Sequence, residues 1–376
     1  MLISPTTLSG SIAIPPSKSH TMRALIFASK ASSPSRITNY LDSPDTMAMI
    51  CALRALGTQI EIDSALHITP KPWTIPSHPI DAGNSGQVYR FIRALAPVQM
   101  IGDTATLKRP ITPLLDGLTQ LPHAHIDGTD SQPVSGLLMA MAFHPGPTTL
   151  TVTNPGETPW VALTLDWLKR LNIPFTNDHF THYTLQGSAT YPGFDYSVPA
   201  DFSSASYSWA LSLINTLTYN APPPDPIQGD SALLAQNPLN GGTIDVNPFI
   251  DAVPLLATLG CFAKKPLTLT NGAIARQKES DRLSSITHEL TKMGAHIIEH
   301  PDGLTIHPSP LHGADLFSHH DHRIALSLIV AALSASSPST IDVACIKKSY
   351  PNFIKEIQCL SSSALQPLEK QPLAAR

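Results

Sequence analysis

Residues 276–283, RQKESDRL, concentrate charge at one point of the chain: five of the first seven are charged, against 14% of all residues. The apolar positions that follow recur at helical spacing and predict one side of a helix, formed by Leu283, Ile286, Leu290 and Met293. We take Ser280 as the N-cap of this helix and Asp281 as an acid of its first turn. The remaining cations oppose the helix macrodipole, and a bound anion would remove that penalty. The stretch therefore indicates either an anion site or a solvated cluster of ion pairs.

Basic residues also stand at other expected helix starts. PPSKSHTMRAL places Lys18 and Ser19 before an apolar helix and Arg23 one turn later, which suits an oxyanion but lacks the glycines of a Walker loop. Similar stretches are DAGNSGQVYRFI, KRPI, HHDHRIAL and IKKSYPNF, which contribute Gly83, Gly86, Arg90, Arg109, Arg323, Lys347 and Lys348. One such stretch alone is typical of a protein surface. Their recurrence in a charge-poor chain predicts a shared site for a polyanionic ligand.

Three segments share one layout, a helix, a turn and two short strands. They are ICALRALGTQIEIDSALHITP, LDWLKRLNIPFTNDHFTHYTLQG and ITHELTKMGAHIIEHPDGLTIHP, and their spacing is too long for a solenoid. Gly57, Asn172 and Gly294 stand where each helix should end in a left-handed residue. LLDGLTQLPHAHIDG resembles a fourth copy without its hairpin, and APPPDPIQGD with NPLNGG marks another abbreviated region. We therefore predict internal repetition of a larger α/β unit.

The composition excludes several classes of protein. At 376 residues, two domains are expected. A formal net charge of −4 without a basic run argues against nucleic acid as a partner. The four cysteines lack CxxC spacing, which indicates reduced thiols rather than disulfides or a zinc site. No export signal, membrane-length apolar run or coiled-coil pattern is visible, so we expect a cytoplasmic monomer that does not bind membranes.

Ten short motifs extend over nearly the whole chain in the order of a known family. They are SKSHTMRAL, LDSPDT, GNSG, RPI, DSQ, DFSSASY, FIDAVP, KESDRL, HHDHRIA and KKSYPNF. In combination they resemble the 5-enolpyruvylshikimate-3-phosphate synthases, the 3-phosphoshikimate 1-carboxyvinyltransferases. The resemblance implies the two-domain α/β enolpyruvyl transferase fold, an inside-out α/β barrel built from repeated βαβαββ units.

The resemblance also implies how the chain divides. Residues 18–199 would form one domain of three units. Residues 1–17 and 200–376 would form the second domain of three units, with the active site in the cleft between the two. Members of the family are usually longer, and we place the shortfall near residues 121–130 and 221–243.

The implied reaction transfers the enolpyruvyl group of phosphoenolpyruvate to the 5-hydroxyl of shikimate 3-phosphate and releases phosphate. It proceeds by addition and elimination through a tetrahedral intermediate, on the shikimate pathway to chorismate and the aromatic amino acids. No metal or organic cofactor is implied, and the partners are the two small-molecule substrates.

Site residues are implied motif by motif. Asp251 resembles the carboxylate that takes the proton of the attacking hydroxyl, Glu279 the acid that protonates the methylene, and Lys18 a cation that assists at the bridging oxygen. The implied ligands of shikimate 3-phosphate are Lys18, Ser19, Arg23, Ser131, Gln132, Asp251 and Lys278. Those of phosphoenolpyruvate are Lys18, Gly86, Arg109, Gln132, Arg282, Arg323 and Lys348.

The chain departs from the family pattern at five positions. Gln87, Asp130, Glu157, Trp160 and Ile274 stand where the family usually has Thr, Ser, Ser, Tyr and Asn. We expect Asp130 to point away from a phosphate and Trp160 to stack on the acceptor ring. Glu157 conflicts with a phosphate site, because its charge has the same sign.

The expected site holds seven cations, which would repel one another before the substrates bind. Two like charges about 4 Å apart at an effective dielectric near 20 repel by about 4 kcal/mol. We therefore expect an open free form that the anionic substrates close.

Three alternatives remain open. A UDP-N-acetylglucosamine enolpyruvyl transferase resembles this fold, but it usually begins with a Lys-Asn pair, where this chain has Lys18 and Ser19, and carries a reactive Cys in a mobile loop. A metal hydrolase could use HHDH, residues 319–322, but adjacent side chains diverge and no matching HxxE or HxH partner occurs. The departures also allow an inactive binding homologue.

Overall fold

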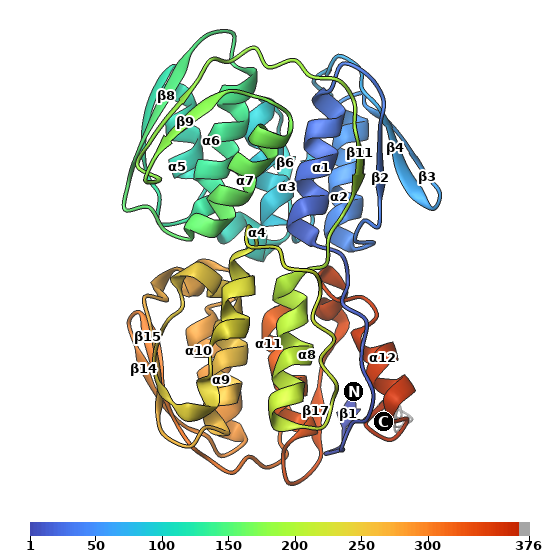
Figure 1. Cartoon of the computed structure of the whole chain (residues 1–376), viewed down its shortest axis with the longest axis vertical. Helices are drawn as coiled ribbons and strands as arrows, with labels where there is room; N and C mark the ends of the chain where they lie inside the picture. Colours follow the sequence, from blue (N-terminus) through green and yellow to red (C-terminus); the bar gives the residue numbers. More distant parts are fainter. Residues whose placement is uncertain (368–376) are drawn as a thin grey trace, which may run out of the picture.

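The computed structural model describes residues 1–367, which form two halves stacked along the long axis (Figure 1). Each half has its own hydrophobic core. Buried apolar side chains of residues 22–198 form the core of the upper half. Those of residues 3–12 and 207–365 form the core of the lower half. Within residues 1–367 no helix combines the length and the apolar character needed to cross a bilayer.

Four sheets share one pattern, in which two parallel strands are followed by an antiparallel pair. In the upper half their orders are β11 (Asp195–Ser197), β2 (Ser35–Thr38), β4 (Ala65–Thr69), β3 (Gln59–Ile62), and β7 (His123–Asp127), β8 (Thr148–Thr153), β10 (His182–Leu185), β9 (Phe175–Asp178). In the lower half they are β12 (Gly242–Asp245), β13 (Leu267–Thr270), β15 (Gly303–His307), β14 (His296–His300), and β16 (Asp315–Leu316), β17 (Ser339–Ile341), β1 (Leu2–Ile3), β18 (Leu365–Gln366).

Two of these sheets are built as complete βαβαββ units. In one, α6 (Ser131–Phe143) joins β7 to β8 and α7 (Thr158–Arg170) leads to the hairpin β9–β10; in the other, α9 (Val253–Cys261) and α10 (Arg282–Lys292) take the same places. A third hairpin, β3–β4, follows α2 (Pro44–Ala55). The predicted turn residues Gly57, Asn172 and Gly294 have φ of 104°, 54° and 93°. The predicted repetition is therefore confirmed.

The other two sheets each take a strand from a distant part of the chain. β11 follows the last hairpin of the upper half and pairs with β2, which lies after α1 (Lys18–Lys30). The N-terminal strand β1 lies between β17 and β18; α11 (His322–Leu333) contacts β1, and α12 (Phe353–Leu360) contacts β18. The two ends of the chain thus close one repeat of the lower half.

Each half also contains a reduced unit. In the upper half it comprises β5 (Ile80–Asp81), α3 (Gly86–Leu95), β6 (Met100–Ile101), α4 (Thr104–Lys108) and α5 (Thr112–Thr119), and α5 leads to β7 without a hairpin. In the lower half α8 (Phe202–Ile214) is followed by the 3-10 helices η1 (Gly229–Ala235) and η2 (Pro238–Asn240). Both segments that the sequence marks as abbreviated lack the hairpin of the full unit. Further 3-10 helices are η3 (Asn247–Ala252), η4 (Ala273–Gln277) and η5 (Ala344–Lys348).

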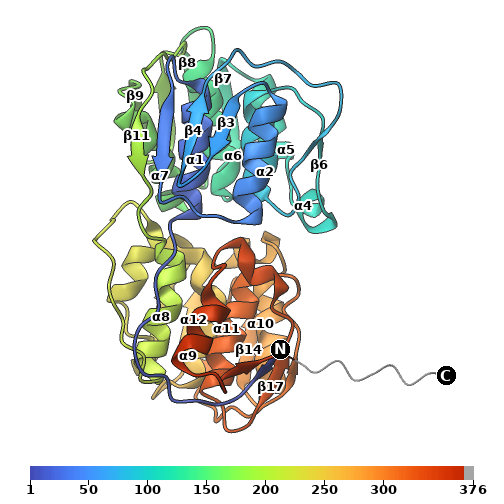
Figure 2. The same ribbon diagram turned by 90° about the vertical axis from the view of Figure 1, so that its right-hand side faces the viewer.

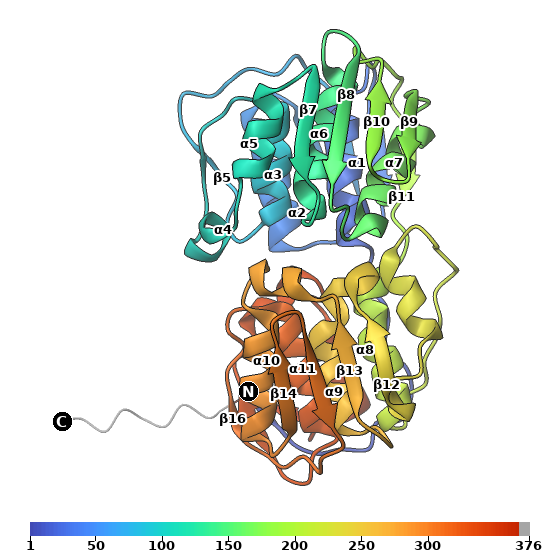
Figure 3. The ribbon, with the colours of Figure 1, turned by 90° about the vertical axis from the view of Figure 1, so that its left-hand side faces the viewer.

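The helices lie inside each half and the sheets cover them from outside (Figures 1 and 3). All residues of α9 and α11 are buried, and so are most residues of α1, α6 and α8. A helix that is apolar on every side is stable only when it is surrounded. This confirms the expected inside-out α/β arrangement.

The chain crosses between the halves twice, and the crossing segments run side by side (Figure 2). Ser17 N donates to Pro199 O at 2.7 Å, and Asp201 N donates to Pro15 O at 2.8 Å. The crossing is therefore a short two-stranded ribbon, stiffened by the diproline at residues 15–16.

Candidate active site

The N-termini of seven helices, α1, α2, α3, α6, α7, α8 and α11, meet at one cavity between the halves. Six of them are capped by a Ser or Asp side chain, namely Ser17, Ser43, Ser85, Asp130, Asp201 and Asp321. Unpaired backbone N–H groups give a helix N-terminus a partial positive charge. Their convergence makes the cavity suited to anions before any side chain is counted.

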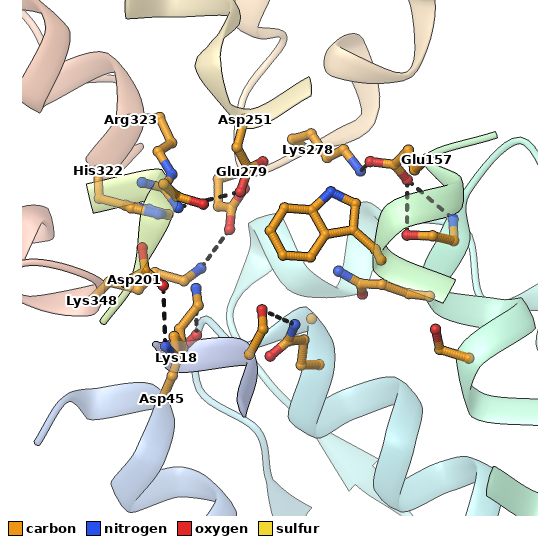
Figure 4. Close-up of a pocket in the computed structure, with 18 of the residues that line it drawn as sticks. Lys18, Asp45, Glu157, Asp201, Asp251, Lys278, Glu279, His322, Arg323 and Lys348 are labelled. Atoms are coloured by element: carbon orange, nitrogen blue, oxygen red, sulfur yellow. Dashed lines mark hydrogen bonds and ion pairs between the residues drawn. The ribbon is translucent and has the colours of Figure 1, made fainter. Parts of the chain in front are cut away.

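The cavity is small and receives side chains from both halves (Figure 4). Its volume is about 60 Å³, whereas ligand pockets usually enclose roughly 300–1,000 Å³. An outer pocket of about 720 Å³ shares Arg109, Lys278 and Glu279 with it. The sequence-predicted site residues that line the cavity are Lys18, Ser19, Arg23, Gly86, Arg109, Ser131, Gln132, Asp251, Lys278, Glu279, Arg323 and Lys348.

Arg282 is the predicted site residue that does not line the cavity. It is 1% exposed and holds three carboxylates. Nε donates to Asp321 at 2.8 Å, Nη1 to Asp251 at 2.6 Å and Nη2 to Glu279 at 2.8 Å. The nitrogen atoms of Arg282 are thus engaged by acids, two of which are the predicted catalytic carboxylates. Contact of Arg282 with phosphoenolpyruvate stays a prediction.

Both of these carboxylates are held in the ionised form. Burial raises the pKa of Asp251, but Arg282 and Arg323 outweigh it and bring the pKa below its ordinary value. Burial also raises the pKa of Glu279, while Lys348 and Arg282 bring it well below its ordinary value. Lys348 Nζ lies 2.7 Å from Glu279 Oε1, and Arg323 Nη2 lies 3.3 Å from Asp251 Oδ2. The direction for Glu279, which the sequence leaves open, is therefore downward.

Two lysines bridge different parts of the cleft. Lys348, from the lower half, donates to the carbonyl oxygen of Asn84 at 2.7 Å and to its Oδ1 at 2.6 Å. Lys18 Nζ lies 3.3 Å from Asp45 Oδ2, and its backbone N donates to Asp201 at 3.3 Å. The two halves are thus joined by charged groups at the site itself.

Two of the predicted cations have no acidic ion-pair partner among residues 1–367. None of the ion pairs within residues 1–367 involves Arg23 or Arg109. Arg23 donates to one hydroxyl and two carbonyl oxygens, and burial lowers its pKa to about 9. Arg109 is 7% exposed, and its Nε finds no acceptor in that part of the chain. A side chain at Gly86 would displace the Arg109 guanidinium.

Glu157 lies among the predicted phosphate ligands. Its Oε2 accepts from Ser131 N and Oγ at 3.1 and 3.2 Å. Its Oε1 lies 2.5 Å from Lys278 Nζ (Figure 4). Glu157 belongs to the upper half and Lys278 to the lower, so the pair also joins the halves.

The other departures from the family pattern lie in different surroundings. Asp130 does not line the cavity and accepts from Gln132 N as the cap of α6. Gln87 and Trp160 do line it. Ile274 is buried in the core of the lower half.

The charges of RQKESDRL serve both predicted purposes: some form ion pairs with one another or with neighbouring acids, and others line the cavity. Arg276 forms ion pairs with Asp281 and Glu299 at 2.9 and 2.7 Å, whereas Lys278 and Glu279 line the cavity. The predicted N-cap is wrong by one residue: α10 is capped by Asp281, which accepts from Ser284 N. The Asp281 carboxylate serves the cap, while Ser280 Oγ donates to Asp321.

The side chains of HHDH diverge. His319 lies 2.9 Å from Glu289, Asp321 holds Arg282, and His322 faces the cavity. Burial and Arg323 lower the pKa of His322 well below its ordinary value, so the ring is neutral. No cluster of three or more His, Cys, Asp or Glu suited to a metal occurs within residues 1–367. This geometry argues against the metal-hydrolase interpretation.

A buried acid lies directly behind the cavity wall. Ser203 lines the cavity and its Oγ donates to Oδ2 of Asp230, whose Oδ1 has no partner within the described residues. Burial and the neighbouring charge of Asp251 raise the pKa of Asp230 to about 7. No sequence signal marks Asp230, since it lies in an abbreviated connection.

Sequence reasoning missed several polar residues of the wall, namely Asp45, Ser135, Asp201, Ser203 and His322. All lie in the first or second turn of a helix or at its cap, mostly inside motifs that were already recognised. They change the charge balance, because six cations and five carboxylates line the cavity. The predicted self-repulsion is therefore wrong, since acids offset most of the positive charge.

Comparison with known proteins gives a consistent result. The sequence model of the family described as EPSP synthase (3-phosphoshikimate 1-carboxyvinyltransferase) matches residues 3–130, 121–236 and 227–357. The 3-phosphoshikimate 1-carboxyvinyltransferase of Chlamydia caviae is 41% identical, covering 96% of this chain and 93% of the relative. That of Chlamydia muridarum is 40% identical, covering 96% and 95%.

Solved structures share the fold. EPSP synthase from Acinetobacter baumannii superposes with a TM-score of 0.78 at 24% identity, covering 96% of this chain and 97% of that one. The enolpyruvyl transferase NikO from Streptomyces tendae superposes with a TM-score of 0.73 at 18% identity, covering 96% of each.

Proposed function

The chain belongs to the EPSP synthase family, the 3-phosphoshikimate 1-carboxyvinyltransferases, and we propose that it transfers the enolpyruvyl group of phosphoenolpyruvate to the 5-hydroxyl of shikimate 3-phosphate. One observation carries the proposal: Lys18, Arg109, Asp251, Glu279 and Arg323, far apart in sequence, line one cavity. Helix N-termini and uncompensated guanidinium groups suit the phosphates and carboxylates of both substrates.

The two carboxylates supply the acid and base chemistry. Asp251 accepts the proton of the 5-hydroxyl while the hydroxyl oxygen bonds to C2 of phosphoenolpyruvate. A proton from Glu279 converts the methylene of phosphoenolpyruvate to a methyl group. In the elimination, phosphate leaves C2 and takes up the proton that Asp251 received, and a methyl proton returns to Glu279, which restores the double bond. Lys18 assists at the bridging oxygen. Asp251 is in the form that can accept a proton, because its carboxylate is ionised.

Glu279 has to gain a proton before it can act as the acid. Its low pKa is caused chiefly by Lys348, with Arg282 and Arg109. Anionic groups of phosphoenolpyruvate would neutralise Lys348 and Arg109, so substrate binding raises the pKa of Glu279 toward its working range.

The remaining ligands are assigned by motif. We assign shikimate 3-phosphate to Lys18, Ser19, Arg23, Ser131, Gln132, Asp251 and Lys278, all of which line the cavity. We assign phosphoenolpyruvate to Lys18, Gly86, Arg109, Gln132, Arg282, Arg323 and Lys348. Arg282 acts on both through the carboxylates that it orients.

We infer that the substrates enter the expected open form, because they do not fit the closed arrangement of this structure. A cavity of about 60 Å³ is too small for both substrates, and the ion pair of Glu157 with Lys278 and the bonds of Lys348 to Asn84 span the cleft. The crossing ribbon at residues 15–17 and 199–201 is the natural hinge. We therefore propose residues 18–199 as one domain and residues 1–17 with 200–376 as the other.

We also propose that the protein is a monomer and is cytoplasmic, a location that its free cysteines fit. Cys51, Cys261, Cys345 and Cys359 form no disulfide. None of them lines the cavity, which disfavours a transferase that depends on a reactive thiol there.

The test is a phosphate-release assay with both substrates, each substrate alone, and UDP-N-acetylglucosamine in place of shikimate 3-phosphate. We expect release only with phosphoenolpyruvate and shikimate 3-phosphate together, with a vinyl ether product seen by proton NMR. Release with UDP-N-acetylglucosamine alone as acceptor, or no release with any acceptor, would overturn the proposal.

A further inference from the structure

Glu157 is a fully buried carboxylate directed into the cavity. Its side chain is 1% exposed, and its oxygens accept from Ser131 N, Ser131 Oγ and Lys278 Nζ. These three donors belong to two residues that the resemblance assigns to shikimate 3-phosphate. A carboxylate of the protein therefore occupies donors that are suited to a phosphate.

The backbone shows that this placement is held by its surroundings. Glu157 has φ 46° and ψ 38°, a left-handed conformation that residues other than glycine rarely adopt. Its side chain does not cap α7, whereas its backbone N donates to Asn247 Oδ1 at 2.8 Å in the lower half. Contacts across the cleft thus keep the carboxylate turned inward.

The neighbourhood offers more donors than one carboxylate uses. Ser135 lies one turn beyond Ser131 on α6, lines the cavity, is 1% exposed, and its Oγ has no partner within residues 1–367. Arg23 lines the same cavity without an acidic partner. A group with three terminal oxygens and a double negative charge would satisfy these donors better than Glu157 does.

We propose that Glu157 determines acceptor specificity by competing, as an internal anion, with the ring phosphate of the acceptor for Ser131 and Lys278. The inference rests on the proposed function and deepens it. When the phosphorylated acceptor binds, the carboxylate gives up these donors and remains near a group of like charge. The chain therefore prefers a phosphorylated acceptor over an unphosphorylated one, but this preference is weaker than it would be with a neutral residue at position 157.

Equilibrium binding of two probes isolates this effect. Shikimate 3-phosphate and shikimate differ only in the phosphate. The ratio of the Kd of shikimate to the Kd of shikimate 3-phosphate therefore reports on the phosphate site alone. Glu157→Gln keeps the size of the side chain and removes its charge. We expect it to raise the preference for shikimate 3-phosphate over shikimate by about tenfold or more, and to leave the Kd of shikimate within about threefold.

Matched variants separate local competition from general electrostatics. Glu157→Ser, also neutral, should change the ratio in the same direction, and Glu157→Asp, which keeps the charge, should leave it close to that of the wild-type protein. Asp130→Asn removes a nearby charge outside the cavity and keeps the cap of α6. Its ratio should change less than that of Glu157→Gln. The two neutral variants also guard against a folding defect in one of them, which thermal unfolding detects.

The outcomes distinguish this inference from the proposed function. A ratio unchanged or lowered in both neutral variants would overturn the competition. An equal rise in Asp130→Asn and Glu157→Gln would overturn it as well, because a charge near Lys278 that does not bond these donors would then have the same effect. Failure of the wild-type protein to release phosphate from both substrates would instead count against the proposed function, whatever the binding ratio.

Discussion

Asp230→Asn tests the most unusual acid of the structure. Asp230 is 1% exposed, one oxygen accepts from Ser203, and the other has no partner within residues 1–367. Burial and the charge of Asp251 raise the pKa of Asp230 from 3.8 to about 7. The Asn side chain has the same shape, can still accept from Ser203, and cannot ionise.

The sign and size of the effect follow from the two pKa values. A folded-state pKa above the unfolded one stabilises the fold at low pH, fully below about pH 4, and this contribution is lost as pH rises through about 7. With those values the wild-type protein loses about 3 kcal/mol of unfolding free energy between about pH 5 and about pH 8 through this carboxyl. Asp230→Asn should not lose it.

Urea-induced unfolding at both pH values measures the difference directly. All other titrating groups are shared by the two proteins, so the pH-dependent gap between them isolates Asp230. Asp116→Asn, at an exposed position of α5, is the matched control and should behave as the wild-type protein does. Equal pH dependence of the unfolding free energy in the wild-type protein and Asp230→Asn would refute the raised pKa that burial gives Asp230.

Three further predictions concern the site. Glu279→Gln should abolish turnover in the phosphate-release assay and leave the Kd of shikimate 3-phosphate within about threefold, since Glu279 acts on the transferred group; turnover within about tenfold of the wild-type rate would be incompatible with its role as the acid. Arg282→Leu should destabilise the fold by about 3–5 kcal/mol in urea unfolding, because the fully buried Asp321 and two partly buried carboxylates lose their common partner; a loss below about 1 kcal/mol would contradict that network. Binding of both substrates should take up a proton at Glu279, seen by calorimetry in buffers of different ionisation enthalpy, and no buffer dependence would count against the assigned pKa change.

The repeated architecture was predictable because local signals agree with the tertiary structure. Gly57, Asn172 and Gly294 end their helices in the left-handed conformation, and apolar periodicity marks the helices between the turns. The grouping of cations at helix starts was also predictable. Helix N-termini meet at one cavity, so residues at those positions come together.

Pairings across the cleft could not be predicted. Lys278 and Glu157 are 121 positions apart, and no local pattern indicates that a carboxylate of one half would bind a lysine of the other. Arg282 resembles the other cations in sequence, but its helix places it behind the wall and not on it. The raised pKa of Asp230 arises only from burial beside Asp251, which is a property of the packed structure.

The bond that breaks in phosphoenolpyruvate tests the central claim most directly. If Asp251 and Glu279 carry an addition and elimination at C2, the carbon–oxygen bond breaks and the bridging oxygen leaves with phosphate. Phosphoenolpyruvate labelled with oxygen-18 at the bridging position should then give labelled phosphate, seen as an isotope shift in phosphorus-31 NMR. Unlabelled phosphate, with the label in pyruvate, would mean attack at phosphorus and would contradict the account.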